Sequence, residues 1–173
     1  MCGIFLKLRY CCNRELLRTV YFALVDSHLQ YCNIIWGNAS EKILKPLVKL
    51  QEKVIRIMYF ASGDQYDMDF IFKDLKLLNL DQLNKLAKAK FVYKYKNQKL
   101  PSSFDKILTN TGHRYALRSQ VTQEFKCIWG KTIFGMKMIQ YVGAQLWNEI
   151  PLEIRSTNSL REFSKKFKSL FFH

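Results

Sequence analysis

The chain has 173 residues, with 28 Lys and Arg against 14 Asp and Glu, and so a formal net charge of +14. Its hydrophobic content of 49% and aromatic content of 14% exclude a disordered basic tail. A chain of this composition can bury enough apolar surface to fold. Only seven Gly and three Pro argue against a turn-rich β-sandwich and predict a mainly α-helical fold.

The first predicted helix covers residues 13–30, and Asn13 is its expected N-cap. Apolar side chains recur there at helical spacing, namely Leu16, Leu17, Val20, Tyr21, Leu24, Val25 and Leu29. A second helical run extends from Ser40 to Tyr59, with a buried side of Ile43, Leu47, Leu50, Val54, Ile57 and Met58. Because proline is tolerated only in a first turn, Pro46 predicts that the regular helix begins near Lys45, after a separate turn at 41–44.

A connection at 61–66 and a short apolar element at 70–77 precede the third long helix. This helix is predicted from Asn79 to about Gln98, with Asn79 and Gln82 as a capping box. Its expected buried stripe is Leu80, Leu83, Ala87 and Phe91. The chain is expected to form a helical region at 1–104 and an extension at 105–173 packed on it, or else a single domain.

Periodicity is poor from residue 105 to 132, which predicts loop or short irregular strands near 125–129. Helix is expected to resume near Met136 and to stop at Pro151. The last helix begins at a second capping box, Ser159 with Glu162, and its apolar face is Leu160, Phe163, Phe167, Leu170 and Phe171.

Two predicted helices carry basic stripes. At about 100° per residue, five cations of the second helix project within a sector of about 80° opposite its apolar side: Lys42, Lys45, Lys49, Lys53 and Arg56. The third helix carries Lys85, Lys88, Lys96 and Lys99, interleaved with Phe91, Tyr93 and Tyr95. Such stripes bind phosphate backbones, and aromatic rings stack on unpaired bases. The alternative interpretation is a solvated helical face, and contact with a membrane surface ranks lower because the apolar faces pack together.

Three apparent catalytic motifs fail on inspection, and we expect no catalytic residue, metal site or cofactor. Gly130-Lys131-Thr132 lacks the first glycine of a phosphate-binding loop, because Phe125 stands in its place. Asp67 and Asp69 are not adjacent and lack a third carboxylate, so Asp67 is interpreted as a helix cap. Cys32 and His28 are interpreted as packing residues rather than a thiolate and its base.

The sequence predicts a soluble, intracellular protein with no membrane partner. No apolar run approaches the roughly 18 residues that span a bilayer, and the amino terminus lacks the pattern of a secretory signal. Five cysteines without metal-ligand spacing suit reduced thiols better than disulfides or zinc.

The order of specific motifs resembles the region that follows the polymerase core in reverse transcriptases of non-LTR retrotransposons, in the jockey and CR1-like groups. The first part of the chain carries Gly3 to Tyr10, Leu16-Leu17, Tyr21 to Val25, Ser27 to Tyr31 and Trp36 to Ser40. The middle carries Leu50-Gln51-Glu52-Lys53 with Ile55-Arg56, Phe72-x-x-Leu75-x-Leu77-Leu78-Asn79-Leu80, and Phe91 to Tyr95 followed by Leu100-Pro101-x-x-Phe104. The end carries Tyr141-x-Gly143-x-x-Leu146-Trp147-Asn148-x-Ile150-Pro151, Ile154-Arg155, Ser159-Leu160-x-x-Phe163 and Lys166 to Leu170.

Two positions depart from the family pattern. Cys32 stands where the family usually has Gly, which predicts a relaxed turn after the first helix, and Leu117 precedes Arg118 where Thr is common. The resemblance implies thumb-like helices and a C-terminal extension that grip template and product, whereas the catalytic aspartates of the family would lie before Met1.

Two functions therefore stay open at this point. The first is a truncated reverse-transcriptase remnant without polymerase activity that binds RNA or an RNA–DNA duplex non-specifically through the two stripes. The second is a helical interaction or self-association module with no nucleic-acid role, anchored by Trp36, Trp147 and the Phe-rich last helix.

Overall fold

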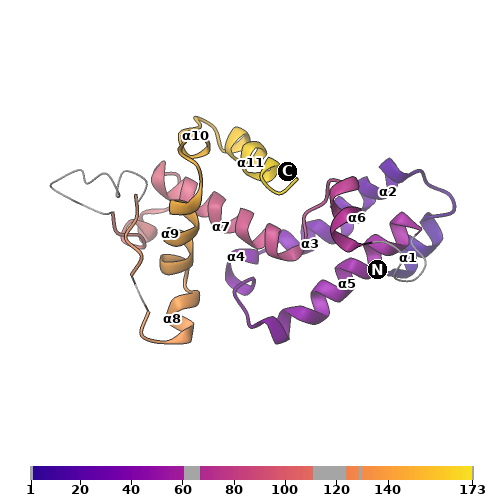
Figure 1. Cartoon of the computed structure of the whole chain (residues 1–173), viewed down its shortest axis with the longest axis horizontal. Coiled ribbons are helices and arrows are strands. Elements are labelled where there is room, and N and C mark those ends of the chain that lie inside the picture. The colour runs from indigo at the N-terminus through magenta and orange to yellow at the C-terminus, as the bar shows by residue number, and fades with distance from the viewer. Residues whose placement is uncertain (1, 61–66, 111–123, 129, 173) are drawn as a thin grey trace. The chain divides into compact units, whose positions relative to one another are not determined.

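A computed structural model describes residues 2–60, 67–110, 124–128 and 130–172 (Figure 1). In these ranges the secondary structure is helical apart from one isolated antiparallel bridge between Asn110 and Phe125. The predicted mainly α fold is therefore confirmed for the described part of the chain. The chain divides into two compact units, residues 1–84 and 85–171, and the boundary between them falls within one helix. The predicted boundary near residue 104 lies inside the second unit.

The first unit begins with short helical elements: α1 (Cys2–Leu8), α2 (Arg14–Tyr21), the π-helical turn η1 (Phe22–Asp26), α3 (Ser27–Gln30) and α4 (Asn33–Trp36). The predicted helix over 13–30 is confirmed as the run α2–η1–α3, and the Asn13 side chain accepts from the Leu16 N–H at 2.9 Å. Helix α1 was not predicted, because only Phe5 of its seven residues is buried and no periodic pattern arises.

The turn after α3 contains a residue in the left-handed backbone conformation. Cys32 has φ 48° and ψ 25°, the region that glycine adopts most easily. The predicted relaxation of this turn is therefore not seen at Cys32, since the residue takes the glycine conformation despite its Cβ.

Helix α5 (Glu41–Tyr59) is continuous through Pro46, so the predicted separate turn at 41–44 is wrong. The Leu44 N–H already donates to the Ser40 carbonyl at 3.1 Å, which places the first turn upstream of the proline. Pro46 therefore deprives only the Lys42 carbonyl of its helical donor.

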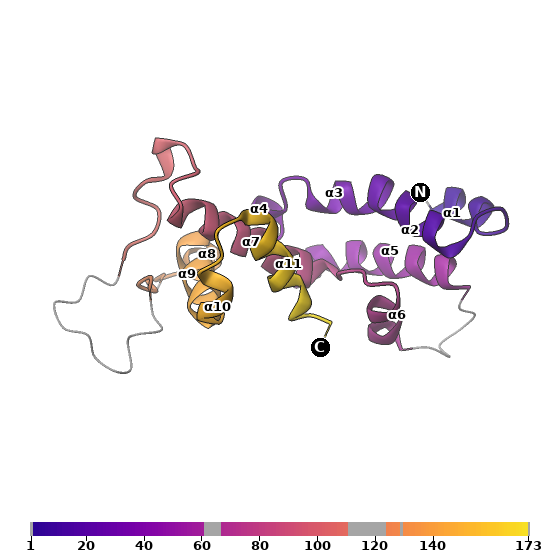
Figure 2. The same cartoon turned by 90° about the horizontal axis from the view of Figure 1, so that it is seen from above.

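The predicted apolar side of α5 is buried only in its second half. Val54 and Met58 are each 1% exposed, whereas Ile43 is 68% and Leu50 is 45% exposed. The helices that pack on α5 are α1, α2 and α6 (Met68–Asp74), seen from above in Figure 2, and the buried residues of α5 run from Gln51 to Met58.

The core of the first unit gathers large side chains from α1, α2, α5, α6 and the segment after α6, including Phe5, Leu17, Tyr21, Val54, Ile55, Met58, Ile71 and Leu77. Burying each such side chain contributes about 2 kcal/mol to folding. One polar group lies among them: the Gln51 amide donates to the Tyr21 hydroxyl at 2.9 Å and to the Leu78 carbonyl at 3.0 Å.

Helix α7 (Leu80–Lys96) begins at the predicted capping box. The Asn79 N–H donates to Gln82 at 3.0 Å, and the Gln82 N–H donates to Asn79 at 2.9 Å. The helix ends two residues before the predicted Gln98, which adopts φ 52° in a left-handed C-terminal turn. Ala87 and Phe91 of the predicted stripe are only half-buried, because α7 also buries Leu86, Ala89, Val92 and Tyr93 on other sides.

The second unit continues with η2 (Ser102–Phe104), α8 (Ile133–Lys137), α9 (Ile139–Glu149), α10 (Leu152–Arg155) and α11 (Leu160–Ser169). The helix predicted near Met136 starts at Ile133, because the Thr132 side chain caps the Gly135 N–H at 3.0 Å. Extended Met138 then separates α8 from α9. The last helix is confirmed, with the Glu162 N–H donating to the Ser159 hydroxyl at 3.1 Å.

An aromatic core holds the second unit together. The ring of Phe163 stacks on Tyr93 at 4.6 Å, on Trp147 at 5.7 Å and on Phe167 at 5.9 Å between centroids. Gly143 of α9 lies where a Cβ would meet the Val92 side chain at 3.1 Å, so a glycine lets α9 approach α7.

Some predictions concern residues outside the described ranges: the connection at 61–66, half of the irregular segment at 105–132, and the Leu117–Arg118 departure. Among the helices that the structure does describe, each is too short or too polar to cross a membrane.

Candidate nucleic-acid interface

The basic stripe of α5 lies on the exposed side of the helix. Lys42, Lys45, Lys49 and Lys53 are exposed, and Arg56 in the same sector is half-buried. From Lys42 to Lys53 the stripe extends about 17 Å at 1.5 Å per residue. Since a nucleic-acid strand carries one phosphate per roughly 3.4 Å of axis, the four lysines match the length of about five phosphates.

The packing of α5 fixes the direction of this stripe. Val54, Ile55 and Met58 are nearly inaccessible in the core of the first unit, so the helix cannot rotate about its axis without exposing them. Glu41 and Glu52 lie at one border of the lysine sector rather than within it. The stripe is therefore a fixed line of positive charge.

The predicted stripe of α7 is interrupted by one buried lysine and by an ion pair, although three of its four lysines are exposed. Lys85 is exposed, but Lys88 is only 7% exposed. The Lys96 ammonium lies 2.9 Å from the Glu124 carboxylate and 5.7 Å from the centroid of the Trp147 ring. Lys99 is exposed beyond the end of the helix. Projection on a helical wheel missed these partners because they come from distant segments.

The aromatic residues predicted to interleave with that stripe take part in internal packing. Phe91 meets Phe104 edge to face at 5.7 Å. The buried Tyr93 hydroxyl donates to the Thr157 carbonyl at 2.7 Å. The Tyr95 hydroxyl lies 2.8 Å from the Leu108 carbonyl. These contacts make the three rings poor platforms for stacking on bases.

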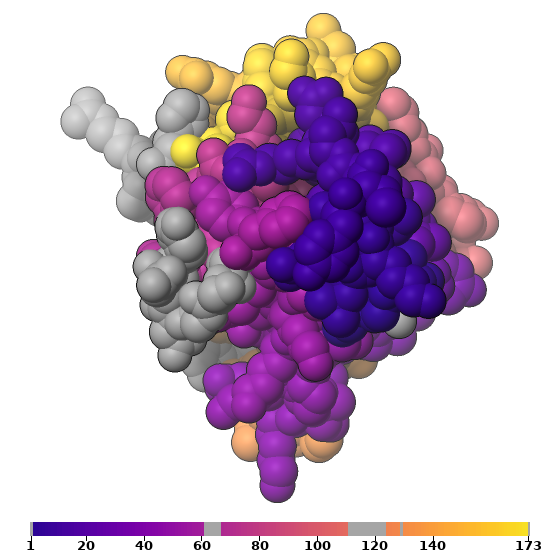
Figure 3. Space-filling model, turned by 90° about the vertical axis from the view of Figure 1, so that its right-hand side faces the viewer, coloured from indigo at the N-terminus to yellow at the C-terminus, as the bar shows by residue number. Residues whose placement is uncertain are grey.

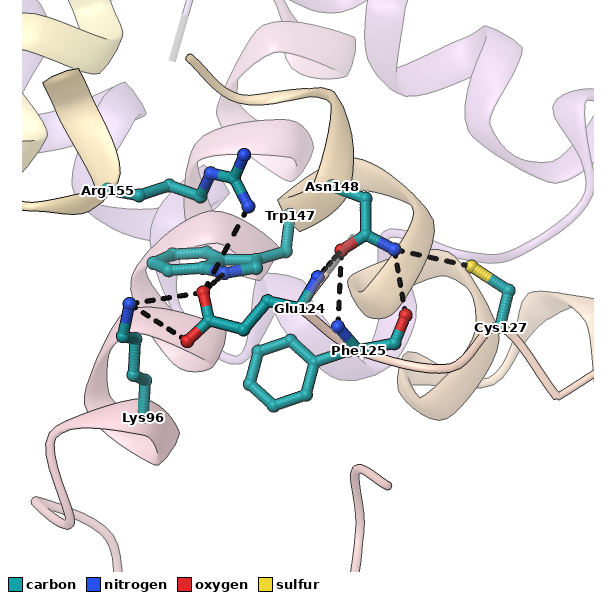
Figure 4. A network of polar contacts seen from close by, with 7 residues as sticks. All are labelled: Lys96, Glu124, Phe125, Cys127, Trp147, Asn148 and Arg155. Carbon is teal, nitrogen blue, oxygen red and sulfur yellow. Dashed lines mark hydrogen bonds and ion pairs between the residues drawn. The ribbon is translucent and has the colours of Figure 1, made fainter. Parts of the chain in front are cut away.

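A polar network in the second unit was missed by the sequence analysis (Figure 4). The Glu124 carboxylate accepts from the Trp147 indole N–H at 2.8 Å, pairs with Lys96, and lies 4.0 Å from the buried Arg155 guanidinium. A single carboxylate between two cations can hold a segment in place.

The side chain of Asn148 holds the same segment through hydrogen bonds to the backbone of Glu124 and Phe125. Its side-chain oxygen accepts from the N–H groups of Glu124 at 3.0 Å and Phe125 at 3.3 Å, and its amide donates to the Phe125 carbonyl at 2.8 Å (Figure 4). The ring of Phe125 is buried next to Tyr95 and Trp147. We call Glu124 to Cys127, held in this way, the clasp. The only sequence signal for it was the Trp147-Asn148-x-Ile150-Pro151 motif.

The candidate catalytic residues have structural contacts. Asp67 caps α6 by accepting from the Asp69 N–H at 3.3 Å, as predicted. Cys32 occupies the left-handed turn, and Nδ1 of His28 lies 3.4 Å from the neighbouring Ser27 hydroxyl. Within the described ranges, no group of three or more His, Cys, Asp or Glu residues could hold a metal ion.

Three of the anchors expected for an interaction module lie in the interior, whereas Trp36 is half-buried and Leu170 is 46% exposed. Trp147 and Phe163 are inaccessible and Phe167 is 3% exposed, because they form the aromatic core. Trp36 is half-buried, and its indole N–H donates to the Tyr31 carbonyl at 2.7 Å.

No protein-family model matches the chain, and neither a curated protein nor a solved structure matches it. The function must therefore be argued from the residues. Of the nine predicted nucleic-acid-binding residues, the structure brings the four exposed lysines of α5 together in one line.

Proposed function

We propose that this chain is part of a non-LTR retrotransposon reverse transcriptase and binds RNA or an RNA–DNA duplex without sequence preference. The segment has no polymerase activity of its own in this account, because it carries no adjacent pair of aspartates to hold catalytic metal ions. Its role is to grip the nucleic-acid backbone.

The observation that carries the proposal is the exposed lysine line of α5, from Lys42 to Lys53. Lysines at these spacings neutralise phosphates and release their counterions, whatever the base sequence. The same helix carries the Leu50-Gln51-Glu52-Lys53 and Ile55-Arg56 motif that resembles the family. The motif order along the rest of the chain supports the family assignment.

Binding of the full chain to a short RNA–DNA duplex tests the proposal. Fluorescence anisotropy at roughly 50 to 200 mM salt should show affinity that falls steeply with salt and that is equal for duplexes of unrelated sequence. Absence of binding at the lowest salt, or affinity that does not change with salt, would overturn it.

A further inference from the structure

Helix α5 carries a second feature on the side away from its lysines. Ile43, Leu47, Leu50, Val54 and Ile57 follow one another at alternating spacings of four and three residues. This repeat aligns the side chains in one seam, the pattern by which a helix packs against another helix. We call these five residues the α5 seam.

The structure covers the seam in its second half only. Val54 is 1% and Ile57 is 9% exposed, in contact with the core built by the helices that pack on α5. Ile43 is 68% and Leu50 is 45% exposed, with Leu47 half-buried between them. In Figure 3 the violet atoms at the start of α5 lie at the lower end, away from the indigo atoms of α1 and α2. Within the described residues of the first unit, a surface continuous with a packed helix interface is thus left uncovered.

The charges beside the open half of the seam have one sign. At 100° per residue, Lys42 and Lys53 lie about 60° to 100° around the helix from Ile43 and Leu50. Glu41 and Glu52 lie about 140° or more from the same two residues. A second copy of this chain, with its own net charge of +14, is repelled by such a border.

We propose that the open half of the α5 seam binds an amphipathic helix of another protein whose apolar face is bordered by carboxylates. Ile43, Leu47 and Leu50 supply the apolar contact, and Lys42 and Lys53 select acidic residues beside it. Lys42 and Lys53 also belong to the proposed nucleic-acid line, whereas Ile43, Leu47 and Leu50 serve the helix contact alone, so a neutral change in the seam leaves the lysine line intact.

The probe is a synthetic amphipathic helix with leucine at its seam positions and glutamate beside them, titrated against the full chain. A matched pair of neutral substitutions distinguishes peptide binding at the α5 seam from peptide binding at any exposed apolar residue. Ile43→Gln should weaken peptide binding at least tenfold, whereas Ile133→Gln, at an α8 residue that is 69% exposed, should leave binding within twofold. Neither change should alter the affinity for the RNA–DNA duplex. A failure of peptide binding is therefore distinguishable from a failure of nucleic-acid binding.

Three results would overturn the inference. The first is absence of binding by the acidic peptide, and the second is equal binding by a peptide with lysine in place of glutamate. The third is sedimentation that depends on protein concentration and that Ile43→Gln abolishes, which would make a second copy the occupant. Circular dichroism of both variants checks that they fold.

Discussion

Four residues other than glycine adopt positive φ in the described part of the chain: Cys32, Phe60, Lys76 and Gln98. A side chain in this conformation places its Cβ close to the following carbonyl oxygen, at a cost of about 1–2 kcal/mol. Cys32 is exposed and stands where the resembled family usually has Gly, so it is the most direct position at which to relieve this strain.

Cys32→Gly should raise the free energy of unfolding by about 1 kcal/mol, since the relieved strain exceeds the extra entropy of glycine in the unfolded chain. Urea unfolding measures this change in the free energy of unfolding. Cys11→Gly is the control, because Cys11 is also exposed but is not among the residues with positive φ, and this change should destabilise. Equal shifts in both variants would contradict the explanation.

Burial raises the pKa of Tyr21 to about 12, against the ordinary value of 10. The folded state therefore holds this proton more tightly than the unfolded state. The associated stability is complete below pH 10 and is lost as pH rises through 12, by about 3 kcal/mol in total. Tyr21→Phe should flatten this part of the stability curve, although it costs about 1 kcal/mol at neutral pH through the lost partner of Gln51. An unchanged alkaline slope would refute the assignment.

At the scale of elements, the clasp joins segments that lie far apart in sequence. Asn148→Ala removes three hydrogen bonds to the part-buried backbone of Glu124 and Phe125. The expected loss is about 2–4 kcal/mol, measured by urea unfolding. Gln145→Ala, at an exposed position of the same helix, should change stability by less than about 0.5 kcal/mol. Comparable losses in the two variants would show that the clasp contributes little.

Local features of these elements were predictable, whereas the partners of individual side chains were not. The caps at Asn13, Asn79 and Ser159 join residues three apart, so a short window of sequence contains all the atoms involved. The Trp147 indole reaches a carboxylate 23 residues away, and no periodicity encodes that contact.

The same limit explains the unequal outcome for the two basic stripes. Helical geometry places Lys88 and Lys96 in one sector with Lys85, but it does not show that Lys88 is buried or that Lys96 pairs with Glu124. In α5 the projection identified the exposed lysines because its lysine side is opposite the core residues Val54 and Met58.

At the scale of the whole molecule, the central claim is that the net charge of +14 acts through one line of lysines rather than through diffuse attraction. A charge-matched comparison separates the two explanations. One variant replaces Lys42, Lys45, Lys49 and Lys53 by Ala, and the other replaces four exposed lysines from elsewhere: Lys73, Lys106, Lys131 and Lys165. Both variants have the same net charge.

The most direct test is the slope of log affinity against log salt concentration for a short RNA–DNA duplex, measured for the full chain and both variants. The account predicts that replacing the α5 lysines reduces the magnitude of the slope by about three units, while the scattered replacement reduces it by less than about one. Equal slopes for the two variants would contradict the account, because binding would then follow net charge and not the α5 stripe.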